Sequence, residues 1–302
     1  MSLRQEFLNI ALRLSARPYL SRVRDPVEAR KQAEFGAAFL RTPPFTLSLP
    51  VPLGEVSGLA VRSGRVSDPR KIMLYFHGGG YLAGSPRTHR ALAARISRLA
   101  RVEVILPGYR LAPEHPFPAA MTDAETVWDH LIACGYAPDG IVLGGDSAGG
   151  GLALALLARL CARGTPPAGL VAFSPWTDMT GSGESYRINA RRDPMLPSDR
   201  LQEARDFVLQ GAAPDHPDAS PLFAAFPGAP PVLIQHSETE ILADDSLRMA
   251  ARLRDFGAEV MVQSWPRAPH VWQLFDGYIP EARAALSDAA RTIRQMLSLP
   301  PR

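Results

Sequence analysis

The stretch "IVLGGDSAGGGLALALLARL", residues 141–160, holds a glycine-rich turn between an apolar run and a helical one. Within it, Gly145 to Gly149 match the pattern G-x-S-x-G, with Ser147 at the centre. A sharp turn from strand to helix needs small residues beside the serine, because the strained backbone brings neighbouring segments close and leaves no room for Cβ atoms. By composition such a pattern arises in about one chain in ten of this length, so its weight comes from the strand before it and the helix after it. We expect Ser147 to be a nucleophile at the end of a strand.

A phosphate-binding loop is the competing interpretation of so many glycines. Such a loop of the G-x-x-x-x-G-K-[ST] kind needs a lysine, and a dinucleotide-binding turn needs the spacing G-x-G-x-x-G. The stretch has neither. The nucleophile is therefore the better interpretation.

Around this turn, short β-rich apolar runs alternate with longer segments of helical period. The runs begin at residue 46 and read "TLSLPV", "GLAV", "IMLYF", "VEVIL", "IVLGG", "LVAFS", "VLIQHS" and "EVMVQSW". Helical stretches lie at 87–100, 117–133, 148–163, 245–256 and 281–297. Strands that alternate with helices and are apolar on both faces predict an α/β fold with a mostly parallel sheet of eight strands flanked by helices.

Two segments do not follow this alternation. Residues 1–45 hold two helical segments that end where Pro43 and Pro44 break the pattern, and residues 180–215 hold glycine, serine and proline followed by one helix. We expect both to cover one end of the sheet. The expected organisation is N-terminal cap helices at 1–45 and a catalytic domain at 46–302, with a cap insertion at 180–215.

Composition excludes several classes of protein. With 302 residues, 46% of them hydrophobic and 21% charged, the chain is an ordinary globular one. The net charge of +3 is spread over scattered arginines, so no nucleic-acid partner is expected.

The two cysteines, Cys134 and Cys161, lack the spacing of metal ligands, so we expect no metal. Both read as core residues in a reducing compartment, which favours a cytoplasmic protein. The first twenty residues read as an amphipathic helix rather than a signal peptide, and no apolar run is long enough for a membrane span.

The third strand run ends in "HGGGY", residues 77–81. Consecutive glycines let backbone N–H groups approach a developing oxyanion, and each such donor is worth about 3–4 kcal/mol. A flexible glycine turn is the alternative, but the histidine in front and the later G-x-S-x-G motif favour an oxyanion hole. We assign Gly78 and Gly79 as its loop donors and Ala148 as the donor that follows the nucleophile.

The general base is selected from seven histidines by chain order. Where G-x-S-x-G supplies the nucleophile, the triad runs serine, acid, histidine along the chain, so the base follows the last strand. Only His270, in "PRAPHVWQLF", stands there. His77 is expected to brace the glycine loop, and His236 lies inside its strand.

These motifs together resemble a known family. "HGGGY", "GDSAGG" and "YRLAPEHPFPAA" are similar to the hormone-sensitive lipase family of α/β-hydrolases, the bacterial family IV carboxylesterases, and "SPWTD", "NARRDPML" and "SPLFA" support the resemblance between about residues 71 and 275. It implies an α/β-hydrolase fold with a helical cap and a serine esterase that prefers short acyl esters and needs no cofactor. It also implies structural roles for residues 109–110 and 113–114, and a possible homodimer through the strand near 258–264. At Gly108 the family commonly has aspartate, which removes one expected support of the glycine loop.

The catalytic acid lies in "SETEILADDS", residues 237–246, which holds four carboxylates. The family commonly has D-P-L-x-D-E here, and alignment places Glu240 at the acid position. Asp244 and Asp245 begin a helix, where carboxylates cap free N–H groups. Glu238 directly follows its strand, so Glu240 is preferred, with Glu238 and Asp244 as alternatives. A glutamate is one bond longer than an aspartate, so its backbone should lie about 1.5 Å farther from His270.

Large side chains beside these loops are candidates for substrate contact: Tyr81, Trp176, Met195 and Trp272. Each fits an acyl or alcohol pocket and equally a core position. The sequence thus predicts a serine carboxylesterase that hydrolyses small-molecule esters of short to medium chain through an acyl-enzyme. A lactone, amide or carbamate hydrolase would use the same residues. A non-enzymatic receptor, like the plant gibberellin receptors that resemble this family without the catalytic histidine, is disfavoured by Ser147 and His270.

Overall fold

The computed structural model describes residues 2–300. One sheet of eight strands forms its centre, in the order β1-β2-β4-β3-β5-β6-β7-β8. The strands are β1 (Thr46–Leu53), β2 (Val56–Ser63), β3 (Ile72–Phe76), β4 (Glu103–Pro107), β5 (Ile141–Asp146), β6 (Gly169–Phe173), β7 (Val232–Ser237) and β8 (Val260–Trp265). Strand β2 is antiparallel to β1 and to β4, and the other neighbours are parallel. The predicted eight-stranded, mostly parallel sheet is confirmed.

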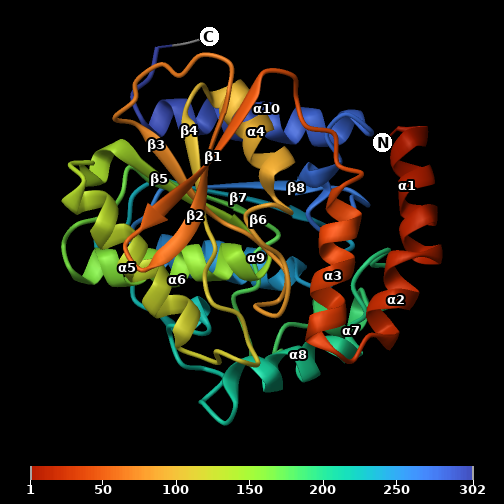
Figure 1. The fold of residues 1–302 in the computed structure, drawn as a ribbon. Helices are drawn as coiled ribbons and strands as arrows, with labels where there is room; N and C mark the ends of the chain where they lie inside the picture. Colours follow the sequence, from red (N-terminus) through yellow and green to blue (C-terminus); the bar gives the residue numbers. More distant parts are fainter. Residues whose placement is uncertain (1, 301–302) are drawn as a thin grey trace.

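Helices cover both faces of this sheet. Helices α4 (Arg90–Ala100) and α10 (Pro280–Met296) pack on one face, and α5 (Ala119–Ala133), α6 (Ala148–Ala162) and α9 (Ala243–Asp255) pack on the other (Figure 1). Every residue of β3 to β7 is buried, which is why these strands read as continuous apolar runs rather than alternating ones. Short 3₁₀ turns lie at η1 (Pro138–Gly140), η2 (Pro221–Phe223) and η3 (Trp272–Phe275).

The segment before the sheet forms three helices, where the sequence predicted two. They are α1 (Leu3–Leu14), α2 (Ala16–Arg22) and α3 (Pro26–Ala37). The extra break falls at Ser15 because Pro18 has no N–H to donate to the carbonyl of Leu14, so the first helix cannot continue unbroken.

The later irregular segment holds two helices, a short α7 (Ser185–Ile188) and α8 (Asp199–Leu209). Helix α8 contacts α2, so the two segments meet although they lie far apart in the chain (Figure 1). Within residues 2–300, no helix combines the length and the apolar character needed to cross a bilayer.

Candidate active site

The G-x-S-x-G turn joins β5 to α6, as the sequence predicts. Ser147 has φ 52° and ψ −124°, a backbone conformation that costs a non-glycine residue energy. Its N–H donates to the carbonyl of Phe173 at 2.9 Å, and its own carbonyl accepts from the N–H of Trp176 at 2.9 Å. The end of β6 therefore holds the strained turn in place on both sides.

The glycines of this turn are required by close backbone approach. A Cβ atom on Gly149 would lie 2.2 Å from the carbonyl oxygen of Phe76. One on Gly145 would lie 2.3 Å from the carbonyl oxygen of Gly149. Real Cβ atoms do not come so near to backbone, so only glycine fits at either position.

His270 follows β8 and contacts one of the four clustered carboxylates. Its Nδ1–H donates to Oε2 of Glu240 at 2.6 Å, and both side chains are buried. The other oxygen of Glu240, Oε1, accepts the N–H of Ser237 at 2.9 Å. Burial disfavours the charged imidazole, but the hydrogen bond and charge of Glu240 outweigh it, so the pKa of His270 is raised above its ordinary value.

The loop of His270 lies beside the nucleophile turn. The N–H of Val271 donates to Oγ of Ser174 at 3.4 Å, and Ser174 directly follows Phe173, whose carbonyl accepts the N–H of Ser147. The segments that follow β5, β6, β7 and β8 therefore meet at one edge of the sheet, because carboxyl ends of parallel strands lie at the same edge.

The other three carboxylates of residues 237–246 have different surroundings. Glu238 is exposed. Asp244 accepts the N–H of Ser185 at 2.9 Å, and Asp245 accepts the N–H groups of Thr177 and Asp178 at 2.7 and 2.9 Å. Glu240 is thus the carboxylate that the fold brings to His270.

The expectation that Asp244 and Asp245 cap their own helix is wrong. Helix α9 begins at Ala243, its N-cap residue is Leu242, and no side chain caps it. Both aspartates stand inside the first turn, from which their carboxylates reach amides of residues 177–185 instead. Burial, with the nearby charge of Asp178, raises the pKa of Asp245 to about 7, although the hydrogen bond from the N–H of Thr177 opposes this rise.

The glycine loop after β3 differs from the sequence prediction at Gly78. The N–H of Gly78 donates to Oδ1 of buried Asp146 at 3.1 Å, so it is not the free donor that was expected. Within residues 2–300, the N–H groups of Gly79, Gly80 and Ala148 have no hydrogen-bond acceptor. Gly79 and Gly80 have φ of 123° and 65°, a region that glycine adopts readily, which lets the loop turn its amides away from Asp146.

Aromatic contacts hold the glycine loop from behind. The hydroxyl of Tyr109 donates to the carbonyl of His77 at 2.6 Å, and the two rings stack at 4.3 Å with 15° between their planes. Burial lowers the pKa of His77 to about 3, so the ring stays neutral at ordinary pH. The loop is therefore braced although Gly108 replaces the aspartate common in the resembled family.

Two residues of the motif "NARRDPML" hold the loop that carries Glu240, a role that the sequence alone does not predict. Nδ2 of Asn189 donates to the carbonyls of Glu238 and Glu240 at 3.0 and 2.9 Å. Oδ2 of Asp193 accepts the N–H of Ile241 at 3.0 Å. Both side chains are buried, so this segment fixes the backbone on each side of Glu240.

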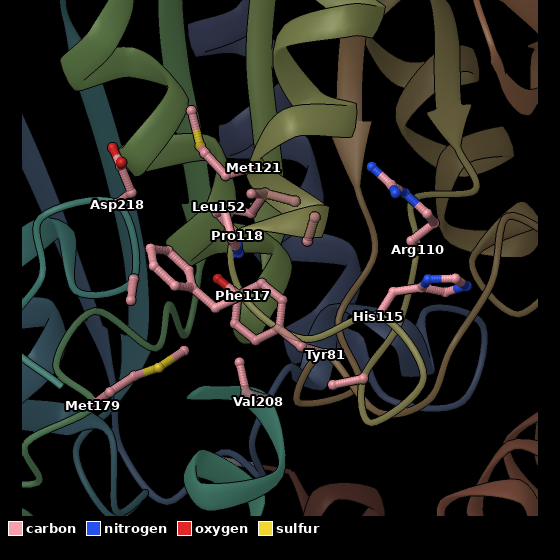
Figure 2. A pocket seen from close by; sticks show the side chains of 13 residues that line it. Tyr81, Arg110, His115, Phe117, Pro118, Met121, Leu152, Met179, Val208 and Asp218 are labelled. Carbon is pink, nitrogen blue, oxygen red and sulfur yellow. The ribbon is translucent and has the colours of Figure 1, made fainter. Parts of the chain in front are cut away.

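The predicted substrate-contact residues lie in different places. Tyr81 lines a pocket together with Phe117, Leu152, Met179 and Val208, and Figure 2 shows these largely apolar side chains converging. Three polar residues also line this pocket, which are Arg110, His115 and Asp218.

The other three candidates are not part of this pocket. Trp176 is buried, with its ring centre 6.4 Å from that of Tyr81, and Met195 is half-buried. Trp272 is fully buried in a separate core cluster with Trp265, so the structure gives it a packing role. Within residues 2–300, no group of three or more His, Cys, Asp or Glu side chains is arranged to hold a metal ion.

Comparison with known proteins extends over most of the chain. Residues 73–274 match the model of a family described as alpha/beta hydrolase fold. An acetyl-hydrolase of Streptomyces hygroscopicus is 37% identical over 266 residues, which cover 88% of this chain and 87% of that protein. An esterase of Acinetobacter venetianus is 35% identical over 245 residues, or 80% of each protein. The crystal structure of an esterase from the bacterial hormone-sensitive lipase family has 34% identity and a TM-score of 0.92, with 98% of this chain and 99% of that one covered.

Proposed function

Because the chain belongs to the hormone-sensitive lipase family of the α/β-hydrolase fold and is a carboxylic ester hydrolase, we propose that it cleaves esters through Ser147 and an acyl-enzyme. The observation that carries this proposal is the buried 2.6 Å contact between His270 and Glu240, on a loop beside the strained serine turn. A neutral imidazole held by a carboxylate is the general base that a serine hydroxyl needs.

In the first half of the reaction, Oγ of Ser147 attacks the ester carbonyl and Nε2 of His270 takes the hydroxyl proton. Glu240 keeps Nδ1 protonated, so Nε2 has the free lone pair, and it stabilises the imidazolium that forms. His270 then gives the proton to the alkoxide that leaves. In the second half, water attacks the acyl-enzyme and His270 takes and returns a proton in the same way.

The oxyanion of the tetrahedral intermediate needs preorganised donors. We assign this role to the N–H groups of Gly79, Gly80 and Ala148, which have no other acceptor in the described part of the chain. Gly78 acts behind them, because its hydrogen bond to Asp146 anchors the loop next to the nucleophile turn.

We assign the apolar pocket beside Tyr81 to the acyl chain of a short to medium ester. Leu152 stands on α6 five residues after Ser147, and Met179 stands three residues after Trp176, which donates to the carbonyl of Ser147. Val208 of α8 closes the pocket from the side of the insertion. In this proposal residues 1–45 and 180–215 act as the cap over the catalytic domain.

The test is labelling by a fluorophosphonate probe together with turnover of p-nitrophenyl butyrate. Ser147→Ala should lose the label and lower kcat by about 10⁴-fold or more, because it removes the proposed nucleophile. Ser57→Ala, at an exposed serine of β2, is the matched control and should behave as the parent enzyme. Retained labelling of a folded Ser147→Ala protein would refute the assignment of the nucleophile.

A further inference from the structure

Helix α1 buries two polar side chains and leaves four large apolar ones exposed. Gln5 and Asn9 are buried, and they donate to the carbonyls of Pro266 and Arg267 at 3.3 and 2.8 Å. The opposite face carries four exposed apolar side chains, with exposed fractions of 52–78%: Leu3, Phe7, Ile10 and Leu14. Their spacing of three and four residues makes one continuous stripe, which we call the apolar stripe of α1.

This stripe is not explained by packing within the chain. Helix α1 docks through Gln5, Leu8, Asn9 and Leu12, which lie on the opposite side, and α1 itself lies at the outer edge of the molecule (Figure 1). A folded protein gains nothing from holding four such side chains in water, and a contiguous exposed apolar face is typical of an interaction surface.

The charge around the stripe identifies the kind of partner. Arg4 and Arg13 flank it on α1, and the guanidinium of Arg13 donates to the carbonyls of exposed Arg191 and Arg192. Exposed Arg267 adds a fifth guanidinium, paired with Glu6 at 3.2 Å. Along the whole chain, residues 1–41 carry eight basic and four acidic residues, whereas residues 42–302 carry 25 basic and 26 acidic ones.

We propose that the apolar stripe of α1 and the arginines around it bind the surface of an anionic lipid bilayer. A helix with an apolar face and basic flanks lies in the plane of the interface, its apolar side chains among the acyl chains and its cations at the headgroups. A second copy of this chain fits the stripe less well, because stripe against stripe would bring five arginines of one copy against five of the other.

Such docking would leave helix α1 between the bilayer and the segment that leads to His270. Pro266 and Arg267, which α1 contacts, precede His270 by four and three residues. An enzyme held this way meets esters dissolved in the lipid as well as esters in water. The proposal concerns this surface alone, so it stands or falls separately from the assignment of the triad.

The experiment is flotation of the full chain with vesicles of phosphatidylcholine, and with vesicles in which a third of the lipid is phosphatidylglycerol. We expect binding to the anionic vesicles that weakens when salt rises from about 0.01 M to about 1 M, because the Debye length then falls from about 30 Å to about 3 Å. Phe7→Glu combined with Leu14→Glu should lower the partition coefficient by at least about tenfold. Arg4→Gln combined with Arg191→Gln should weaken binding to the anionic vesicles only.

Leu247→Glu is the matched control, since Leu247 is an exposed leucine on α9, away from the stripe. It should float as the parent does, and all variants should keep their rate on p-nitrophenyl butyrate in water. The proposal is overturned if the Phe7 and Leu14 variant floats like the parent, or if the parent does not bind anionic vesicles at low salt. It is also overturned if sedimentation shows a dimer that this variant converts to a monomer, since a second copy would then cover the stripe.

Discussion

The side chain of Glu240 spans the gap to His270 with one methylene more than an aspartate has. Glu240→Gln keeps the shape but loses the charge, and an amide can present its NH₂ group to Nδ1 and so favour the wrong tautomer. We expect kcat for p-nitrophenyl butyrate to fall by about 10³- to 10⁴-fold. Glu240→Asp should also lose activity, because its carboxylate ends about 1.5 Å short of Nδ1.

Asp244→Asn is the control for this prediction. The side-chain oxygen of an asparagine can still accept the N–H of Ser185, so kcat should change little. A larger loss for Asp244→Asn than for Glu240→Gln would mean that the acid has been assigned wrongly.

A second buried carboxylate, Asp245, should make stability depend on pH. Its pKa of about 7 in the folded protein lies above its ordinary value of 3.8, so the folded state binds the proton more tightly than the unfolded one. The contribution of Asp245 to stability is therefore fully present below about pH 4 and is lost as the pH rises from about 4 to about 7. Asp245→Asn cannot ionise, so its free energy of unfolding relative to the parent should rise by about 1.4 kcal/mol per pH unit over this window.

Denaturant unfolding at several pH values measures this slope. If the Asp245→Asn side chain lost a hydrogen bond, the free energy of unfolding would shift equally at every pH, and the slope would stay unchanged. Asp129→Asn, which removes a carboxyl that is 64% exposed, is the control for the loss of a charge at the surface. A flat difference for Asp245→Asn would show that this carboxyl titrates in its ordinary range.

The residues that carry chemistry could be selected from the sequence because each has a local signal. Ser147 lies in a spaced motif, and His270 is fixed by chain order. The hydrogen-bond partners of individual amides and carboxylates could not be predicted in this way. Whether Gly78 faces an oxyanion or Asp146 depends on a contact across two strands. Whether Asp245 caps its own helix or binds residue 177 depends on how α9 sits against the segment that follows β6.

Among the elements, the segment after α7 has a mechanical role in the site. Asn189 holds the carbonyls on both sides of Thr239, and its loss would remove both hydrogen bonds, each of which contributes about 0.5–1.5 kcal/mol. We expect Asn189→Ala to lower kcat by about tenfold or more while KM for a short ester changes little, because the acid moves and the pocket does not.

Arg187→Ala, at an exposed residue of α7, is the control and should leave both constants unchanged. A change in KM alone for Asn189→Ala would place Asn189 in substrate binding and not in the support of Glu240.

The elements themselves were largely predictable. All eight strands and the five helices that flank the sheet follow from their apolar period, with ends that differ by three residues or fewer. The N-terminal break at Ser15 and the short α7 did not follow, because a single missing N–H at Pro18 and a four-residue helix leave almost no trace in a periodic pattern. A periodic pattern of apolar residues predicts a buried face, so the sequence does not reveal that the apolar stripe of α1 would face solvent.

The molecule as a whole joins a tightly packed sheet to an N-terminal segment held mostly by arginines. No residue of α2 or α3 is buried. Instead, Arg17 donates to the carbonyls of Ala190, Asp193 and Leu196, and Arg30 donates to those of Leu82 and Ala112. A segment with few buried apolar contacts should open at a lower free energy than the core.

Arg17→Ala should therefore loosen the segment without unfolding the protein. Its three hydrogen bonds join α2 to residues 190–196, so their loss should raise amide hydrogen exchange in both places by about tenfold, while β3, β5 and β6 keep their protection. The melting temperature should change by only a few degrees, because global unfolding is set by the core. Arg22→Ala, at an exposed residue of the same helix, is the matched control. If exchange in Arg17→Ala rises equally in the central strands, then α2 and the sheet unfold together, and the N-terminal segment is part of the core's cooperative unit.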